Sequence, residues 1–160
     1  SAITLLHEAI ENGSIDCSLW SLGGQIVNAH IKDSEVALHW TACAIEECST
    51  HPEVLKQRGV ALLTVGRFEE ALPFFAKAPQ HPVTEAAKIL CQASTDKPIS
   101  PIDPDKEGII STAFVNWYRR LLDYEAESAA QKTAGKIESL KKVLPMAASV
   151  LEEALAESNE

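Results

Sequence analysis

The residues of this sequence that most resemble a reactive site are His39, Cys43 and Cys48. In a helix, His39 and Cys43 lie one turn apart, so an imidazole nitrogen and a thiolate sulfur could bind the same zinc ion. A zinc site needs further ligands at characteristic spacings, and none follows in the sequence. We therefore interpret the three residues as ordinary packing residues, and we expect neither a metal ion nor another cofactor.

Other patterns that support catalysis are missing from the sequence. It has no glycine-rich phosphate loop, no nucleophile elbow, no HExxH motif and no dinucleotide-binding fingerprint. Its paired acids are consecutive, so the two carboxylates of each pair point in different directions around a helix and should lie in solvent. The pairs are Glu46 and Glu47, Glu69 and Glu70, and Glu152 and Glu153. We expect that this chain is not an enzyme, although a catalytic domain could lie elsewhere in a longer polypeptide.

The composition indicates one domain of ordinary size with a hydrophobic core. The chain has 160 residues, of which 46% are hydrophobic. No apolar run approaches the roughly 20 residues needed to span a bilayer, so we expect no membrane insertion. A formal net charge of −9 argues against nucleic acid, whose phosphates demand a basic surface. The partner expected from these properties is a protein.

The cysteines and the start of the chain both favour a cytoplasmic protein. Cys17, Cys43, Cys48 and Cys91 form no CxxC pair and no disulfide-framework spacing. We therefore expect four reducible thiols, mostly buried. The first residues lack the basic region of a signal peptide, although a leader could have been cut away.

The strongest structural pattern is a helical pair within residues 58–78. Gly59 and Ala61 would let a neighbouring backbone approach, and Gly66 supplies a turn. The second helix carries an apolar stripe at the spacing of one helical face. That stripe consists of Phe68, Ala71, Leu72, Phe75 and Ala78. The segment therefore predicts two antiparallel helices in contact.

The same pattern recurs 34 residues earlier in the chain. The matching pairs are Glu35 and Glu69, Ala37 and Ala71, Leu38 and Leu72, Trp40 and Phe74, and Ala44 and Ala78. This period, with small residues in the first helix and an aromatic residue in the second, closely resembles the tetratricopeptide repeat (TPR). Two repeats would cover about 18–51 and 52–82. The resemblance implies an all-α, TPR-like antiparallel helix-pair solenoid that binds other proteins.

The remainder of the chain predicts helices that cap this stack. A leading helix is expected over residues 3–10, and a short third-repeat helix over 85–93. The three prolines of residues 95–105 predict an extended connector. Beyond it, apolar seams run from Ile110 to Tyr124 and from Ile137 to Ala154, with a break expected at Pro145. The expected cap is a C-terminal long-helix hairpin with its turn between 128 and 135. The whole chain forms one domain, in which residues 106–160 pack on residues 1–94.

The TPR resemblance also implies where a ligand would bind. In such domains, the first helices of successive repeats line a concave groove that holds a peptide. The matching positions here are Ser21, Gln25 and Asn28 in the first repeat and Lys56, Val60, Leu63 and Thr64 in the second. The family's well-known clamp for a C-terminal carboxylate uses several Lys and Asn residues, of which only Lys56 is present. The alternative is that the chain's own terminal helices fill this groove.

Three functions are compatible with these observations. The first is a TPR-like protein–protein interaction module that binds a peptide or protein segment in the concave groove. The second is the substrate-recruiting part of a larger enzyme, such as a glycosyltransferase. The third is an oligomerisation unit that uses the 137–154 seam, so the chain could be a monomer or a homodimer through its C-terminal helices.

Overall fold

The computed structural model describes residues 4, 8, 16–124 and 126–158, and apart from residues 4 and 8 the expected leading helix over 3–10 lies outside this range. Over the described part, the regular secondary structure is entirely helical, as the sequence predicted. The elements are α2 (Cys17–Ala29), α3 (Ser34–Glu47), α4 (Pro52–Thr64), α5 (Phe68–Lys77), α6 (Pro82–Ser94), the 3-10 turn η1 (Pro104–Lys106), α7 (Glu107–Asp123), α8 (Glu127–Ala134), α9 (Ile137–Leu140) and α10 (Pro145–Ser158). None of these helices is long and apolar enough to cross a membrane.

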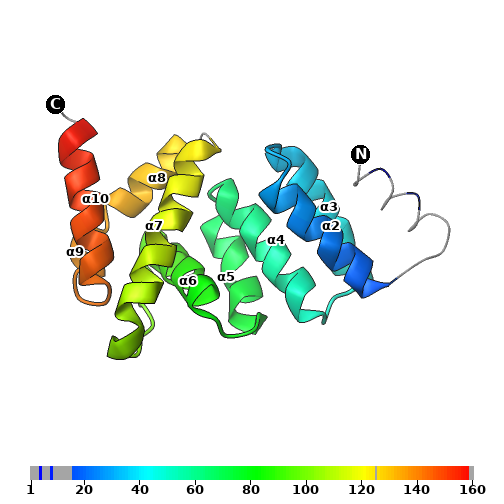
Figure 1. Cartoon of the computed structure of the whole chain (residues 1–160), viewed down its shortest axis with the longest axis horizontal. Helices are drawn as coiled ribbons and strands as arrows, with labels where there is room; N and C mark the ends of the chain where they lie inside the picture. Colours follow the sequence, from blue (N-terminus) through cyan, green and yellow to red (C-terminus); the bar gives the residue numbers. More distant parts are fainter. Residues whose placement is uncertain (1–3, 5–7, 9–15, 125, 159–160) are drawn as a thin grey trace.

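The helices lie side by side along the long axis of the molecule, with α2 and α3 at one end and α10 at the other (Figure 1). Each helix from α2 to α7 packs on the next one in the chain, so that the last of these pairs is α7 and α8. Most of these neighbours are antiparallel helices joined by short loops. In addition, α4 contacts both α2 and α6. The loop between α6 and α7 is longer. It is free of helix from residue 95 to 103, as its prolines predicted.

Local sequence signals explain where several helices begin and end. Asp33 caps α3, because its carboxylate accepts hydrogen bonds from the backbone N–H groups of Glu35 and Val36. His51 caps α4 in a similar way, directly before Pro52 at the first helical position. Gly66 lies in the turn between α4 and α5 with φ +82°, a backbone conformation that favours glycine.

Two clusters of buried side chains form the core. The smaller one lies between α2, α3 and α4 and includes Trp20, Val27 and Trp40. The larger one extends from α4 to α10 and joins Ile89 and Leu90 of α6 to apolar residues of α7. These α7 residues are Ile110, Phe114 and Leu121, all with 0% exposure. The buried part of the α7 seam therefore docks on α6, whereas Trp117 of the same seam is half-buried.

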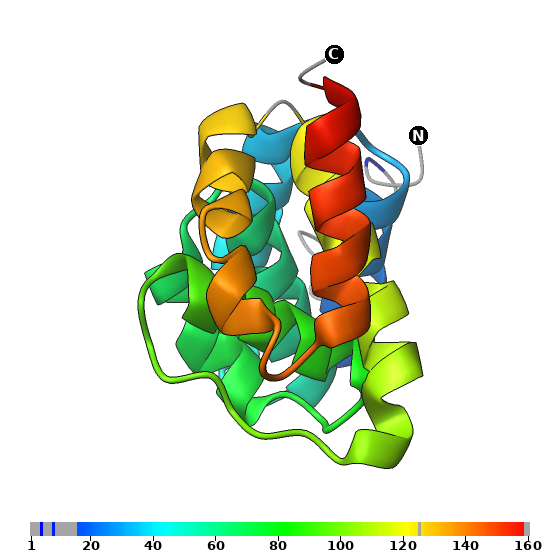
Figure 2. The same ribbon diagram turned by 90° about the vertical axis from the view of Figure 1, so that its left-hand side faces the viewer.

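The C-terminal region differs from the expected two-helix hairpin. Residues 127–134, where the hairpin turn was expected, form α8, which buries Ala129, Ala130 and Thr133 against the preceding helices. The second seam is not one long helix, because the chain leaves the helical conformation after Leu140 and α10 starts at Pro145. A proline at the first helical position loses no hydrogen bond, so the expected break becomes a helix start. Figure 2 shows α10 in front of α7, with α8 and α9 beside it.

Candidate functional site

The structure places the seven expected groove residues on α2 and α4, which contact each other. Five of these side chains are buried: Ser21, Asn28, Val60, Leu63 and Thr64. Gln25 is exposed and Lys56 is half-buried. A ligand that lies on this surface could therefore touch Gln25 and Lys56 directly, whereas it would have to displace other parts of the chain to reach Leu63, which has 0% exposure.

Asn28 holds α2 and α4 together. Its Nδ2 atom donates hydrogen bonds to the backbone oxygen of Gln57 at 3.0 Å and to the side-chain Oε1 of the same residue at 2.9 Å. Both groups are buried, where an unpaired amide would be costly. The Asn28 side chain therefore has a structural role in this conformation.

The C-terminal part of α7 contacts the same surface. Arg120 donates from Nε to the Thr64 hydroxyl at 2.8 Å and from Nη2 to the backbone oxygen of Asn28 at 2.6 Å. The hydroxyl of Tyr124 donates to the same oxygen at 3.3 Å. At Asn28 and Thr64, therefore, the chain's own α7 makes the contacts that a ligand was expected to make.

An open groove lies beside α7, with a volume of about 760 Å³. Its lining comes from the start of α6, from η1 and from one face of α7: Val83, Asp105, Gly108, Ile109, Thr112, Ala113, Asn116, Trp117 and Arg120. The half-buried indole of Trp117 is fixed in position, because its Nε1 donates to the backbone oxygen of Val83 at 2.8 Å. Ile109 is 62% exposed. We name this feature the α7 groove.

A smaller hollow of about 230 Å³ lies on the other side of α7, against α10. Gly108, Thr112 and Asn116 line both the hollow and the α7 groove. The α10 wall of the hollow includes Met146 and Val150, which are 53% and 40% exposed. The first half of α7 therefore presents apolar surface on both of its flanks. Contiguous exposed apolar surface of this kind marks interaction sites in soluble proteins.

Sequence reasoning did not select the α7 groove, although one signal pointed to it. The buried seam of α7 accounts for Ile110 and Phe114, but it leaves Ile109 on a neighbouring face of the helix. A large aliphatic residue outside the core seam is a weak sign of an exposed apolar surface. Asp105 lies in η1, which directly precedes α7, whereas Val83 of α6 is distant in sequence, so only the folded chain brings Val83 to the groove.

The second apolar seam, proposed as an oligomerisation surface, is used within the chain. Leu140, Leu144, Ala147 and Leu151 have exposures of 0–1% and belong to the larger core cluster. Ile137 at the start of the seam is half-buried, and Ala154 at its end is exposed. A second molecule could reach the central part of this seam only if α10 separated from its neighbours.

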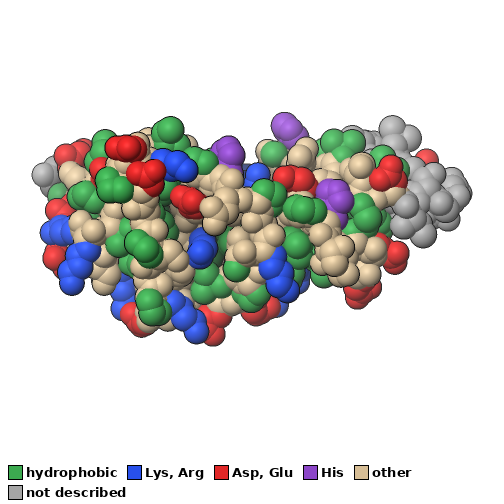
Figure 3. Space-filling model, turned by 90° about the horizontal axis from the view of Figure 1, so that it is seen from below, with side chains coloured by type: hydrophobic (Ala, Val, Ile, Leu, Met, Phe, Trp, Pro, Cys, Tyr) green, Lys and Arg blue, Asp and Glu red, His purple; other side chains and the backbone are tan. Residues whose placement is uncertain are grey.

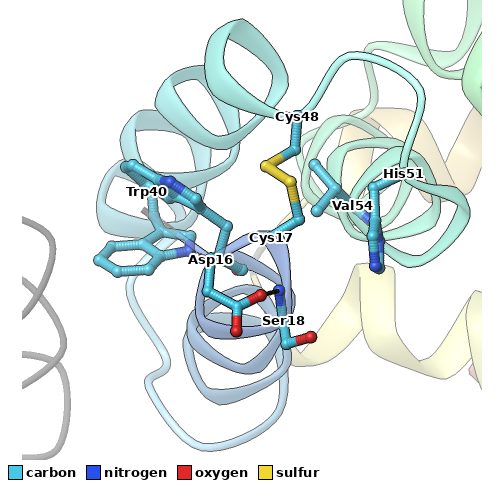
Figure 4. The surroundings of a disulfide bond; sticks show 8 residues. Asp16, Cys17, Ser18, Trp40, Cys48, His51 and Val54 are labelled. Carbon is cyan, nitrogen blue, oxygen red and sulfur yellow. Dashed lines mark hydrogen bonds between the residues drawn. A yellow bond between two sulfur atoms is a disulfide. The ribbon is translucent and has the colours of Figure 1, made fainter. Parts of the chain in front are cut away.

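The expectation of four free thiols is wrong, because Cys17 and Cys48 form a disulfide. Their Cα atoms are 5.8 Å apart, and the bond joins the start of α2 to the residue that follows α3 (Figure 4). The residues are separated by 31 positions, so spacing alone could not reveal that the antiparallel packing of α2 and α3 brings them together. Cys43 and Cys91 remain free.

The disulfide also removes Cys48 from the zinc set that His39, Cys43 and Cys48 suggested. His39 Nε2 lies 3.9 Å from Cys43 Sγ. Among the described residues, no group of three or more His, Cys, Asp and Glu side chains is placed to hold a metal ion. The remaining thiol, Cys91, is completely buried, and burial raises its pKa far above the ordinary value.

The charged surface is mixed. The consecutive acids identified in the sequence are all exposed, as expected, and Glu70 pairs with Arg67 while Glu152 pairs with Lys141. The hydrogen bonds from Arg67 hold the pKa of Glu70 below its ordinary value. On the face shown in Figure 3, acidic and basic side chains of the described residues are interspersed, without a continuous basic band.

Comparison with protein-family models, with curated proteins and with solved structures gave no match. The resemblance to the TPR therefore stays a prediction from the residues and their spacing.

Proposed function

We propose that this chain is a TPR-like protein–protein interaction module, built as an antiparallel helix-pair solenoid, and that it binds a peptide or protein segment along the α7 groove. Two observations support the solenoid: the 34-residue spacing of matching residues and the packing of each helix from α2 to α7 on the next. The observation that carries the binding function is the open groove of about 760 Å³ with Ile109 exposed at its wall.

The groove has the composition of a binding site. Most of its surface is apolar, with Val83, Ile109 and Trp117 among the lining residues, and polar groups such as Asn116 and Arg120 lie between them. Apolar walls supply affinity for a ligand, whereas isolated polar groups fix its orientation. The expected groove on α2 and α4 retains Gln25 and Lys56 as accessible side chains, and neither residue lines the α7 groove.

A free-standing module and the substrate-recruiting part of a larger enzyme would use the same groove, so one binding experiment tests both hypotheses. The cytoplasmic location stays a prediction. The Cys17–Cys48 disulfide favours an oxidising compartment instead, because disulfides persist mainly in such compartments.

The test compares two exposed apolar residues of the same helix. Ile109→Asp alters the groove, whereas Leu122→Asp alters a residue that is 47% exposed and lines neither hollow of α7. Peptides are selected from a displayed random library against the unaltered chain, and their dissociation constants are measured by fluorescence anisotropy. Covering an isoleucine contributes roughly 1.5–3 kcal/mol, so Ile109→Asp should weaken binding by about ten- to a hundredfold.

Leu122→Asp should leave the affinity unchanged, and both variants should keep the helical circular dichroism of the parent, since neither side chain is buried. Two results would count against the proposal. The selection could yield no binding peptide, or the selected peptides could bind the Ile109→Asp variant as tightly as the parent.

A further inference from the structure

Arg120 is a half-buried cation that has no acidic partner among the described residues. Its side-chain hydrogen bonds go to neutral oxygens, those of Thr64 and the Asn28 backbone, and its guanidinium lies 4.6 Å from the ring centroid of Tyr124. Among the described residues, no carboxylate lies within ion-pair distance of Arg120. Burial lowers the pKa of this guanidinium, and the nearby Tyr124 and Asp123 only partly offset that effect.

Removal of a charge from water is costly unless an opposite charge or enough hydrogen bonds replace the water. A guanidinium has five N–H donors. Nε and Nη2 of Arg120 donate to Thr64 and Asn28, whereas Nη1 makes no hydrogen bond to a carboxylate of the described residues, and the neighbouring Tyr124 is neutral. The residue also lines the α7 groove. The groove therefore ends at a positive group that no carboxylate of the described residues pairs with.

We propose that the α7 groove binds an acidic amphipathic helix, in which a glutamate or aspartate side chain pairs with Arg120 while apolar side chains cover Val83, Ile109 and Trp117. This inference rests on the proposed function and names the class of partner. A carboxylate matches a guanidinium in both charge and shape, and a pair in a partly dehydrated groove is stronger than one on an open surface.

Charges at the two ends of the groove also set the direction of the bound helix. Asp105 lines the end opposite to Arg120 and is exposed. The α7 residues that line the groove run from Gly108 to Arg120, 12 positions apart, which corresponds to about 18 Å along a helix at 1.5 Å per residue. A partner helix of similar length should therefore place its acidic residue at the Arg120 end and a basic residue at the Asp105 end.

Long-range electrostatics would favour a basic partner rather than the acidic one proposed, so the two effects predict opposite peptide preferences. The chain has a net charge of −9, so its overall field attracts basic peptides and repels acidic ones. A preference for glutamate over lysine at one peptide position would therefore oppose the overall field and indicate a local cation.

The test uses three pools of synthetic amphipathic helical peptides of about 18 residues, long enough to cover the groove at 1.5 Å per residue. The pools share a mixed Leu, Ile and Phe stripe and differ at one position near the end, which is Glu, Gln or Lys. Anisotropy gives the affinities, and the indole N–H signal of Trp117 in NMR spectra reports occupation of the groove. The Glu pool should bind about tenfold more tightly than the Gln pool, and the Lys pool should bind most weakly.

Variants of the protein assign this preference to one residue. Arg120→Gln should remove the difference between the Glu and Gln pools. Arg120→Lys keeps a positive charge and should retain a preference for Glu. The matched control is Arg119→Gln, which removes the same charge from an exposed neighbour that lines the other side of α7. This control should keep the full preference.

The outcomes separate this inference from the proposed function. If all three pools shift the Trp117 signal with equal affinity, peptide binding stands and the acidic preference is wrong. A preference for Glu that persists in Arg120→Gln would also overturn it. If no pool shifts the signal, the groove is not a peptide site and both proposals fail. A concentration-dependent dimer that occupies the groove and excludes every pool would assign it to a second copy of this chain. The comparison of pools on the unaltered protein decides the question even if Arg120→Gln does not fold.

Discussion

Replacement of Gly23 by alanine sets helix propensity against packing, and the structure indicates which effect is larger. Gly23 lies inside α2, where alanine is favoured over glycine by about 1 kcal/mol. However, a Cβ atom at this position would lie 2.7 Å from Nε1 of Trp40 and closer still to two carbons of the same ring. Carbon atoms in contact normally stand about 3.5–4.0 Å apart, so the indole would have to move.

Trp40 cannot move easily. Its side chain is 2% exposed, and its Nε1 donates to the backbone oxygen of Trp20 at 3.0 Å. Overpacking of a core costs about 1–3 kcal/mol, and this site belongs at the upper end of that range because the obstacle is a rigid ring. After the propensity gain is subtracted, Gly23→Ala should destabilise the protein by about 2 kcal/mol, which lowers the melting temperature by about 4–8 °C for a chain of this size.

Gly108→Ala provides the matched control. Gly108 lies in the first turn of α7, and a Cβ atom there would meet no atom within 4 Å. The substitution should therefore be neutral or stabilise by up to about 1 kcal/mol. Urea denaturation followed by circular dichroism measures both variants. If Gly23→Ala proves as stable as Gly108→Ala, the close packing of Trp40 on α2 is not as described.

Three further predictions concern single residues. Asp96 has a left-handed backbone conformation with φ 58°, and its exposed carboxylate pairs with Lys136. Asp96→Gly should therefore leave the free energy of unfolding unchanged or raise it by up to about 1 kcal/mol, whereas Asp96→Ala should lower it. Denaturant titration distinguishes these results. In the native protein, iodoacetamide should modify Cys43 and spare Cys91, because Cys91 is fully buried and burial raises the pKa of its thiol. Mass spectrometry of digested protein checks this prediction, and rapid modification of Cys91 in the native protein would contradict it. Cys17→Ser opens a disulfide that spans 31 positions and should cost about 3–4 kcal/mol by the loop-entropy relation, and a thiol titration of the denatured, unreduced parent should find two thiols rather than four.

The sequence determined the helices of the repeat region because their signals are local. Asp33 caps the helix that follows it, Gly66 provides the turn, and the apolar residues of α5 recur at the spacing of one helical face. Such signals act over a few residues, so each can be recognised without knowledge of the rest of the chain. The α7 seam could be assigned to the core for the same reason, since Ile110 and Phe114 share one face of a regular helix.

Only the tertiary structure decided which distant groups meet. The Cys17–Cys48 disulfide depends on how α2 packs against α3, and the bond from Arg120 to the Asn28 backbone joins residues 92 positions apart. The α7 groove likewise needs Val83 of α6 to stand beside Trp117. No local preference specifies such pairs, because they follow from the summed packing of several helices and from the loops that direct them. For this protein, local sequence therefore determined the helical segments, whereas the packing of α7 on its neighbours created the candidate site.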